Sequence, residues 1–409
     1  MKIKFSIKQS KFPGMQTELD IRNAIKNDEL VFFYQPKVSL ITGKINGAEA
    51  LIRWIKPDGT LIPPSEFIPT AEASDLIKEI TYHMFPKLVD DLLILNGIDD
   101  ELVTSFNTSA KDFEDDKFTN FVLNTLRISN LPAHALQVEL TETATFQATS
   151  VIKDHIIVLR NAGLSLAMDD FGTGYSSIDT LSKLPFTTIK LDQGIIGRML
   201  SSDKNSTIVS TSIRLAHELG ITIIAEGVET KEQYHHLLNI GCNHVQGYWI
   251  SKPLPFGEFI HFLTSDLNWS MGVPVGLIHM AIVDHVQWRK NLVNKLIKLA
   301  SLEKTDPNRK ASNIVPLSCK ECRLGQWYYG LGQMFNHYQE FQELEQPHDK
   351  LHQIGQYLVT LVKNGSDVDE LIPHLKKLSV QSIQVLNKLQ NLEDKGLADM
   401  HRMNDEIIP

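Results

Sequence analysis

Two adjacent aspartates, Asp169 and Asp170, follow the apolar run of residues 164–168 in the stretch "LSLAMDDFGTGYSS". Side chains alternate between the two faces of a strand. A buried strand that ends in this pair therefore cannot point both carboxylates into water. One interpretation is structural, since aspartate and glycine are common where strands turn. The other is chemical, since one carboxylate can bridge two metal ions while its neighbour holds the second ion.

Other apolar runs also end in polar side chains. The set comprises Glu49, Asn107, Glu139, Glu142, Lys190, Glu226, Glu229 and Gln246, together with the two aspartates. Carboxylates converging on one lysine would repel one another unless cations were bound, and oxygen ligands select hard ions such as Mg²⁺ or Mn²⁺. Two such ions about 3.5–4 Å apart suit in-line attack of water on a phosphodiester. The alternative requires every strand to end in a surface or capping acid by coincidence.

The elements that must position these groups are short apolar runs alternating with amphipathic segments. The runs cover residues 30–40, 47–54, 102–107, 136–142, 164–170, 187–192, 221–227 and 244–249. Strands alternating with helices predict an α/β fold, a modified (β/α)8 barrel of the TIM type, whose active site lies at the carboxyl ends of the strands. The short connection "ITGKIN" between the first two runs is of hairpin length, so one of these two strands is expected to run antiparallel.

The pattern changes near residues 264–276 and becomes helical. Four helices are expected, over residues 277–300, 325–346, 347–365 and 369–401, with a polar surface loop at about 303–318. Helices joined by short loops predict an antiparallel four-helix bundle. We therefore divide the chain into an N-terminal arm (1–17), a barrel (18–264), a linker (265–276) and a helical domain (277–409).

Composition narrows the class of protein. The formal net charge of −9 over 409 residues argues against a general binder of nucleic acid or of anionic membranes. No apolar run approaches the roughly 18 residues of a membrane span, and the N-terminus has no continuous apolar segment typical of a signal peptide. Three cysteines are too few for a disulfide scaffold and suit a reducing compartment, so a cytoplasmic location is expected.

Several separated motifs make residues 18–264 resemble the EAL-type cyclic di-GMP phosphodiesterases. They are "EALIRW", "DDFGTGYSS", "IKLD", "AEGVE" and "QGYWISKPLP", in the order of the family, and the resemblance covers roughly 60% of the chain. It implies a barrel whose mouth holds cyclic di-GMP and hydrolyses one phosphodiester bond to give linear pGpG.

The resemblance also implies roles for the polar set. The first metal ion would be bound by Glu49, Asn107, Glu139 and Asp169. Asp169 would bridge to the second ion, which Asp170 helps to hold. Glu226 would be the general base, and Lys190 would hold the hydrolytic water or stabilise the charged transition state.

Further residues would support this centre or the substrate. Glu142, Glu229 and Gln246 are expected to act as supports, Glu142 by ordering the loop from Phe171 to Tyr175. Arg53 is expected to contact a substrate phosphate, and Gln35 to contact the substrate side of the mouth.

Departures from the family pattern are few and remove no expected ligand. They are Thr187 in place of an acid, Gln193 and Gly194 in place of a basic residue and serine, and Asp75 in place of glycine. Many family members only bind the nucleotide, so the alternative to an enzyme is a silent effector that relays cyclic di-GMP occupancy to a partner. No "GGDEF"-like stretch is found, and a cyclase activity is not expected.

The helical half carries a second set of potential ligands. His348 and His352 are four residues apart on one expected helix, while His285 and Cys322 belong to others. Three imidazoles and a thiolate would form a closed tetrahedral Zn²⁺ site. The alternatives are a chance histidine pair with a buried cysteine, or a plain dimerisation module with surface histidines.

The order His-x-x-Trp, Cys-x-Leu-Gly-x-Trp, His-x-x-x-His, which includes Trp288, resembles the chemoreceptor zinc-binding domain, a dimeric four-helix bundle. It implies zinc bound by the four residues above, a homodimer, and control of the barrel by zinc. The long gap between Trp288 and Cys322 fits an inserted loop at 303–318. Cys319 in "CKEC" suggests half of a zinc ribbon, but the sequence has no second cysteine pair. The sequence leaves open whether zinc activates or inhibits, and whether oxidation of Cys322 is the signal.

Overall fold

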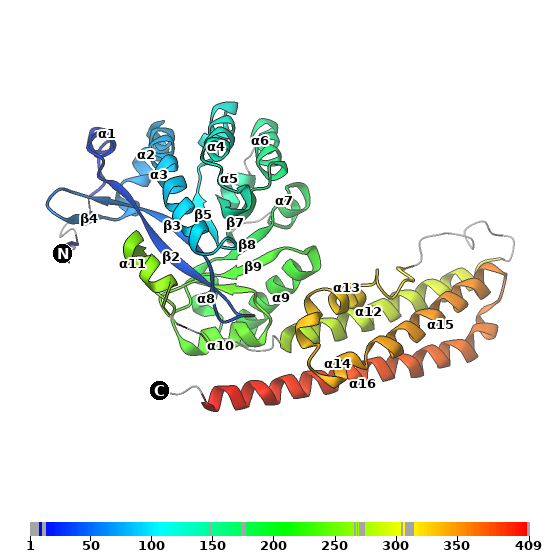
Figure 1. Ribbon diagram of the computed structural model, residues 1–409. Helices are drawn as coiled ribbons and strands as arrows, with labels where there is room; N and C mark the ends of the chain where they lie inside the picture. The colour runs from blue at the N-terminus through cyan, green and yellow to red at the C-terminus, as the bar shows by residue number, and fades with distance from the viewer. Residues whose placement is uncertain are drawn as a thin grey trace. The chain divides into compact units, whose positions relative to one another are not determined.

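The computed structural model describes residues 8–9, 14–146, 149–172, 177–265, 267, 269, 275–303, 306 and 315–406 (Figure 1). Much of the expected arm, of the 265–276 linker and of the 303–318 loop therefore lies outside the described residues, as does the loop after Gly172 up to residue 176. The chain forms two compact units, Met1–Leu237 with Cys242–Trp269, and Leu238–Gly241 with Ser270–Pro409.

The first unit is a closed barrel, as expected. In the described chain its ring consists of β2 (Leu30–Ser39), β3 (Ile45–Ile55), β5 (Val103–Asn107), β6 (Leu136–Thr141), β7 (Ser165–Phe171), β8 (Thr188–Leu191), β9 (Thr222–Ala225) and β10 (His244–Val245). Each strand pairs with the next, and β10 pairs with β2 to close the ring. β2 is antiparallel to both of its neighbours and the other pairs are parallel, which confirms the antiparallel strand expected from the short first connection.

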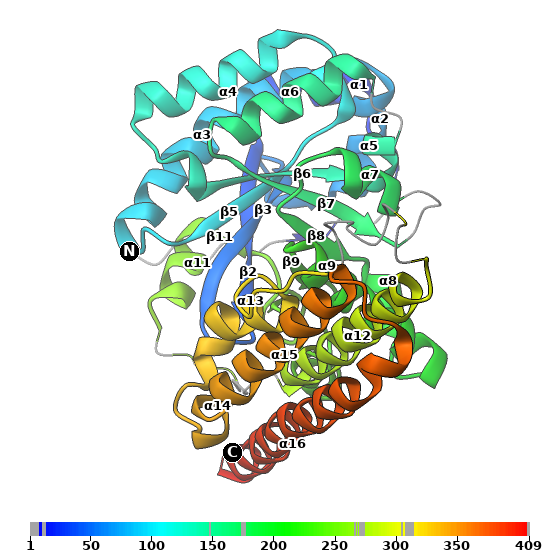
Figure 2. The ribbon, with the colours of Figure 1, turned by 90° about the vertical axis from the view of Figure 1, so that its right-hand side faces the viewer.

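Helices surround the barrel strands (Figures 1 and 2). They are α1 (Glu18–Lys26), α2 (Ile68–Ala73), α3 (Leu76–Ile98), α4 (Asp116–Ser129), α5 (Glu142–Phe146), α6 (Ser150–Asn161), α7 (Ser177–Lys183), α8 (Gln193–Arg198), α9 (Asp203–Leu219), α10 (Lys231–Asn239) and α11 (Phe256–Leu263). Three short strands extend the sheet: β1 (Lys8–Gln9), β4 (Thr60–Ile62) and β11 (Leu254–Pro255). Each of these three strands has only two or three residues and lies outside the apolar runs, so the sequence pattern did not reveal them.

Strand register decides which polar residues become neighbours. Gln35 on β2 lies opposite Glu49 on β3, and Asn107 on β5 lies beside Glu139 on β6. Parallel strands align their carboxyl ends, so residues far apart in sequence meet at one end of the barrel.

The end of β7 is irregular at the aspartate pair. The register with β8 shifts between Met168 and Phe171, and Asp170 has a left-handed φ of 57°. A bulge interrupts the alternation of side chains and re-aims them, which is common beside active sites. This irregularity lets two consecutive carboxylates belong to the same mouth.

The second unit is helical, with α12 (Val275–Ala300), α13 (Arg323–Tyr329), a 3₁₀ segment η5 (Leu331–Phe335), α14 (Gln339–Gln342), α15 (Glu345–Lys363) and α16 (Val368–Glu406). The long helices α12, α15 and α16 pack against one another (Figures 1 and 2). A buried apolar cluster that includes Leu292, Leu351 and Leu389 fills the space between them.

The expected single helix over 325–346 was wrong, because the chain there forms α13, η5 and α14 in succession. Gly330 ends α13 with φ −110° and ψ −116°, which is outside the helical region. Gly332 lies so close to the backbone that a Cβ would come within 2.7 Å of the Trp327 carbonyl oxygen. Two glycines and the packing of Trp327 on Phe335 and Phe341 therefore divide this helix.

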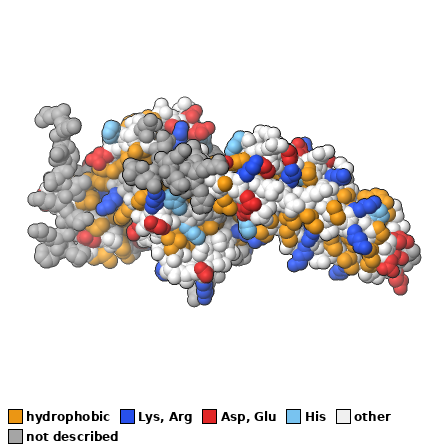
Figure 3. Space-filling model, turned by 90° about the horizontal axis from the view of Figure 1, so that it is seen from below, with side chains coloured by type: hydrophobic (Ala, Val, Ile, Leu, Met, Phe, Trp, Pro, Cys, Tyr) orange, Lys and Arg blue, Asp and Glu red, His pale blue; other side chains and the backbone are white. Residues whose placement is uncertain are grey.

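Within the described residues, no helix is both long and apolar enough to cross a membrane. On the face shown in Figure 3, acidic and basic side chains are interspersed among apolar ones. The expected cytoplasmic location stays a prediction.

Candidate active site and metal centre

Lys190 on β8 is the centre of the polar cluster at the barrel mouth. Its side chain is 1% exposed. Its Nζ lies 2.7 Å from Glu139 Oε2, 2.7 Å from Glu226 Oε1, 3.3 Å from Glu49 Oε2 and 3.3 Å from Asp169 Oδ2. The structure thus brings together four expected site carboxylates from separate parts of the barrel around one ammonium group.

Glu49 is also held by two amides. Asn107 Nδ2 donates to Glu49 Oε1 at 2.7 Å, and Gln246 Nε2 donates to Glu49 Oε2 at 2.7 Å. Gln246 Nε2 also lies 3.1 Å from Gln35 Oε1, and Gln35 Nε2 donates to the Ser251 carbonyl at 3.1 Å. These amides fix the carboxylate, so Glu49 is oriented before any ligand arrives.

Lys37 is a residue of the cluster that the sequence analysis missed. It is 4% exposed, and its Nζ donates to Ser105 Oγ at 2.6 Å and to Glu139 Oε1 at 3.1 Å. Glu139 is therefore held by two ammonium groups, one on each oxygen. The signal was present in "YQPK", because residues two apart on a strand share a face and Gln35 already points into the barrel.

The cluster contains more acids than bases, and this excess perturbs its ionisation. Burial opposes ionisation of Glu139, but Lys190 and Lys37 outweigh it and lower its pKa to about 2. Burial raises the pKa of Asp169 to about 6 and that of Glu226 to about 8, and the neighbouring carboxylates add to both shifts against the opposing effect of Lys190. Burial and the charge of Asp192 raise the pKa of Asp170.

The remaining expected residues lie around this cluster. Glu142 is buried, and its Oε2 accepts a hydrogen bond from the Gly172 amide at 3.2 Å, at the start of the loop it was expected to order. Arg53 is partly buried, with its guanidinium 5.9 Å from the Phe33 ring centroid. Glu229 is exposed, and its backbone amide, not its carboxylate, makes the hydrogen bond to Gln233 Oε1 at 2.8 Å.

The donor set fits hard divalent cations. Glu49, Asn107, Glu139, Asp169 and Asp170 offer only oxygen ligands, which suit Mg²⁺ or Mn²⁺. Four carboxylates converge on Lys190, and Lys37 adds one further ammonium group, so the acids outnumber the bases in this buried cluster. In addition, the buried Gln246 Oε1 has no hydrogen-bond partner within the described part of the chain.

An apolar cavity of about 390 Å³ adjoins the cluster. It is lined by residues of β3, η1 (Pro64–Glu66), α2, α3 and β5, including Leu51, Ile68, Met84 and Phe106, and reaches Asn107. Its size and apolar lining suit a flat group that packs through its faces, such as a nucleobase. Leu51 and Asn107 line the cavity, and they lie on β3 and β5, which also carry residues of the polar cluster. A ligand in the cavity would therefore lie beside the carboxylates.

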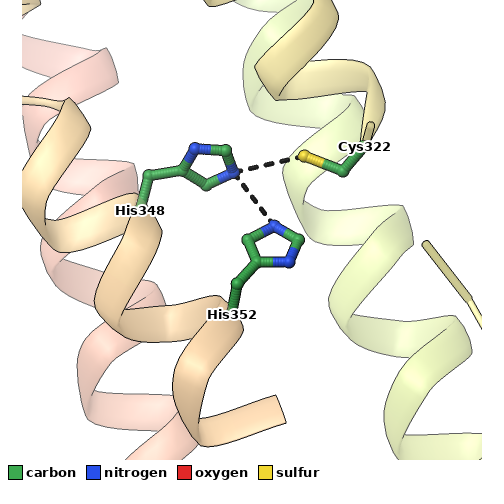
Figure 4. Close-up of side chains that lie close together, drawn as sticks. All are labelled: Cys322, His348 and His352. Atoms are coloured by element: carbon green, nitrogen blue, oxygen red, sulfur yellow. Dashed lines mark hydrogen bonds between the residues drawn. The ribbon is translucent and has the colours of Figure 1, made fainter. Parts of the chain in front are cut away.

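Three of the four expected zinc ligands meet in the helical unit (Figure 4). Cys322 Sγ lies 3.2 Å from His348 Nε2, which lies 3.1 Å from His352 Nε2. With Zn–N of about 2.0–2.1 Å and Zn–S of about 2.3 Å, the edges of a tetrahedral site measure roughly 3.3–3.6 Å. Two of the three donor–donor distances are therefore slightly shorter than the edges of a tetrahedral site, and all three donor atoms lie within 4.8 Å of one another.

The fourth expected ligand, His285, lies outside this three-residue group, and its Nε2 contacts Ser382 Oγ at 2.8 Å. The Trp288 ring packs against His352 at a tilt of 44°, with ring centroids 4.3 Å apart, and its indole N–H donates to the Pro316 carbonyl at 2.8 Å. The tryptophan therefore supports the site and is not a ligand.

These side chains are buried, which favours the neutral imidazoles that zinc requires but disfavours the Cys322 thiolate. Burial lowers the pKa of His348 to about 3 and that of His285 to about 4. Burial also raises the pKa of the Cys322 thiol to about 11. A bound divalent cation would favour the thiolate and use the imidazole lone pairs, so this set fits Zn²⁺.

Comparison with known proteins identifies the two domains. The EAL domain model matches residues 18–253, and the chemoreceptor zinc-binding domain model matches residues 285–359. The cyclic di-GMP phosphodiesterase RocR of Pseudomonas aeruginosa is 32% identical over 243 residues, covering 59% of this chain and 62% of RocR. The signaling protein YkoW of Bacillus subtilis is 35% identical over 259 residues, covering 63% of this chain and 32% of YkoW. The chain thus spans less than two thirds of each of these relatives.

Solved structures show the same barrel. The phosphodiesterase PaMucR in complex with c-di-GMP matches with a TM-score of 0.56 and 34% identity, covering 59% of this chain and 98% of that one. The EAL enzyme Bd1971, bound to cAMP and cyclic di-GMP, matches with a TM-score of 0.57 and 32% identity, covering 60% and 68%. The chain therefore belongs to the EAL domain family and carries a chemoreceptor zinc-binding domain after its barrel.

Proposed function

We propose that this protein is a cyclic di-GMP phosphodiesterase that hydrolyses its substrate to linear pGpG with two Mg²⁺ or Mn²⁺ ions. The observation that carries the proposal is the convergence of four carboxylates on Lys190, beside an apolar cavity large enough for a nucleobase. Relatives named as cyclic di-GMP phosphodiesterases support the same substrate.

The chain's own residues have distinct tasks in this proposal. Glu49, Asn107, Glu139 and Asp169 would hold the first ion, and Asp169 and Asp170 would hold the second. When bound, the ions stabilise negative charge that develops on the phosphodiester. Glu226 accepts a proton from the attacking water, and Lys190 Nζ, 2.7 Å from Glu226 Oε1, fixes that carboxylate and stabilises charge in the transition state.

Substrate orientation is assigned to the rim of the mouth. We assign the phosphate contact to Arg53, and a base to the apolar cavity that includes Leu51 and Phe106. Gln35 and Gln246 keep Glu49 in place, and we assign both to the side of the mouth that faces the substrate. We assign Glu142 to the start of the loop after Phe171, through its bond to the Gly172 amide.

Hydrolysis is expected to require Mg²⁺ or Mn²⁺ and to stop in Ca²⁺, because Ca²⁺ prefers more ligands and looser geometry than the transition state needs. The measurement is chromatography of pGpG formed from cyclic di-GMP with each ion and with excess EDTA. Undiminished turnover in EDTA would contradict the metal mechanism. Tight binding of cyclic di-GMP without pGpG in any ion would favour the silent effector.

We further propose that the helical unit binds Zn²⁺ through His285, Cys322, His348 and His352, and that zinc changes the rate of the phosphodiesterase without entering the barrel site. One ion would join helices that are otherwise held mainly by apolar packing. Both domains resemble families that form dimers, so a homodimer is part of this proposal.

Replacing Cys322 should make the phosphodiesterase rate insensitive to buffered sub-micromolar zinc while Mg²⁺-dependent turnover persists. Cys322→Ser is the more informative variant. Cys322 caps α13 by accepting a hydrogen bond from the Gly325 amide at 3.2 Å, and serine can also cap the helix. The measurement is initial rate against free zinc for wild type, Cys322→Ser and Cys322→Ala. Cys319→Ser, which alters the neighbouring thiol outside the ligand group, serves as control. Identical zinc responses of wild type and Cys322→Ser would make the helical unit a scaffold.

A further inference from the structure

Ser382 is a polar residue at a core position of α16. It is fully buried, whereas core positions of the same helix at Leu378, Val385 and Leu389 are apolar. A buried hydroxyl is costly unless it has a hydrogen-bond partner. The Ser382 hydroxyl contacts the imidazole of His285 on α12, with Ser382 Oγ 2.8 Å from His285 Nε2. The serine therefore ties α16 to an expected zinc ligand on another helix.

His352 shows more clearly how a hydrogen bond to one ring nitrogen fixes the orientation of an expected zinc ligand. Its Nδ1 lies 3.0 Å from the Leu317 carbonyl, which can only accept a hydrogen bond. Nδ1 of His352 must therefore carry the proton, and the lone pair lies on Nε2, the atom that faces His348 in the three-residue group. A hydrogen bond on one ring nitrogen thus selects the other as the metal ligand.

By this logic we propose that Ser382 is a positioning residue for His285, accepting its Nε2–H and leaving Nδ1 as the nitrogen that binds the zinc ion. The inference rests on the zinc site proposed above and adds to it a contact that lies outside the expected ligand set. His285 is 2% exposed, so water does not readily replace the serine as its partner. The contact also makes α16 part of the metal site, although the expected ligands come from α12, α15 and the start of α13.

The test is the zinc affinity of the full-length protein, measured by competition with a chelator of known affinity. Loss of a residue that orients a ligating histidine typically costs 10–100-fold in metal affinity, so Ser382→Ala is expected to raise the zinc Kd by that factor. Ser379→Ala, an exposed serine three residues earlier on α16, is the matched control and should leave the Kd unchanged. The absorption spectrum of the Co²⁺-loaded protein should change in Ser382→Ala and not in Ser379→Ala.

A double-mutant cycle separates positioning from a general effect on the bundle. If Ser382 acts through His285, Ser382→Ala should have no further effect on the Kd in a His285→Ala background. The same loss in both backgrounds would assign Ser382 a purely structural role and overturn the inference. An unchanged zinc Kd in Ser382→Ala alone would also overturn the inference. So would a tighter zinc Kd, because it would show that Ser382 competes with the ion for the imidazole of His285. A wild-type protein that takes up no zinc would overturn the zinc site itself, and this inference with it.

Discussion

Asp169→Asn is expected to reduce hydrolysis of cyclic di-GMP by more than about 10³-fold, because removal of even one preorganised electrostatic group from an active site costs about 10²–10³ in kcat. Asparagine keeps the size and one oxygen of the side chain but loses the charge with which Asp169 would bridge two cations in the proposed mechanism. Glu49→Ala should have an equal effect, since it removes a carboxylate that Asn107, Gln246 and Lys190 all contact. The measurements are pGpG formation and the Mn²⁺ affinity of each variant.

Asp154→Asn is the control, since Asp154 is an exposed acid on α6 of the same unit. It should retain wild-type turnover and Mn²⁺ affinity. The melting temperature of each variant shows whether the barrel is intact. A folded Asp169→Asn protein with near-normal rate and Mn²⁺ affinity would exclude Asp169 as the bridging ligand.

Glu226→Gln is expected to bind cyclic di-GMP with near wild-type affinity but to lose about 10²–10⁴-fold in turnover, the usual contribution of a general base. Glutamine keeps an oxygen that can accept from Lys190 Nζ, now 2.7 Å from Glu226 Oε1, but its amide cannot take up a proton at neutral pH. Binding is measured in Ca²⁺, where no turnover is expected, and the rate in Mg²⁺ under saturating substrate.

Glu232→Gln provides a matched change at an exposed glutamate in the first turn of α10 and should behave as wild type. Two results would count against the assignment of the base. One is a Glu226→Gln rate within a few-fold of wild type, and the other is a parallel loss of binding and rate, which would make Glu226 a substrate contact.

The sequence alone predicted the barrel and most of the side chains that meet at its mouth. Strand-length apolar runs ending in acids predicted both the fold and the mouth, because parallel strands align their carboxyl ends whatever the loops do. Lys190, Glu49 and Glu139 were identified in this way, and the structure places them within hydrogen-bonding distance. Likewise, the spacing of His348 and His352 places both on one face of any helix, and they are neighbours on α15.

Only the tertiary structure decided features that depend on contacts between distant segments. Lys37 became part of the cluster because β2 runs antiparallel between β3 and β10 and points it at Glu139. The bulge at Asp170 overrides the alternation that a regular strand would impose. The apolar cavity combines residues from β3, α3 and β5, which no local pattern connects.

In the helical unit, too, some features were predictable from the sequence and others depended on the tertiary structure. Hydrophobic periodicity predicted α12, α15 and α16, but the division of the expected second helix depended on Gly330, Gly332 and aromatic packing onto Trp327. The pairing of His285 with Ser382 joins residues 97 positions apart in the chain. A sequence pattern reports the period of one segment, whereas such a contact is set by how two helices pack, so it appears only in the folded protein.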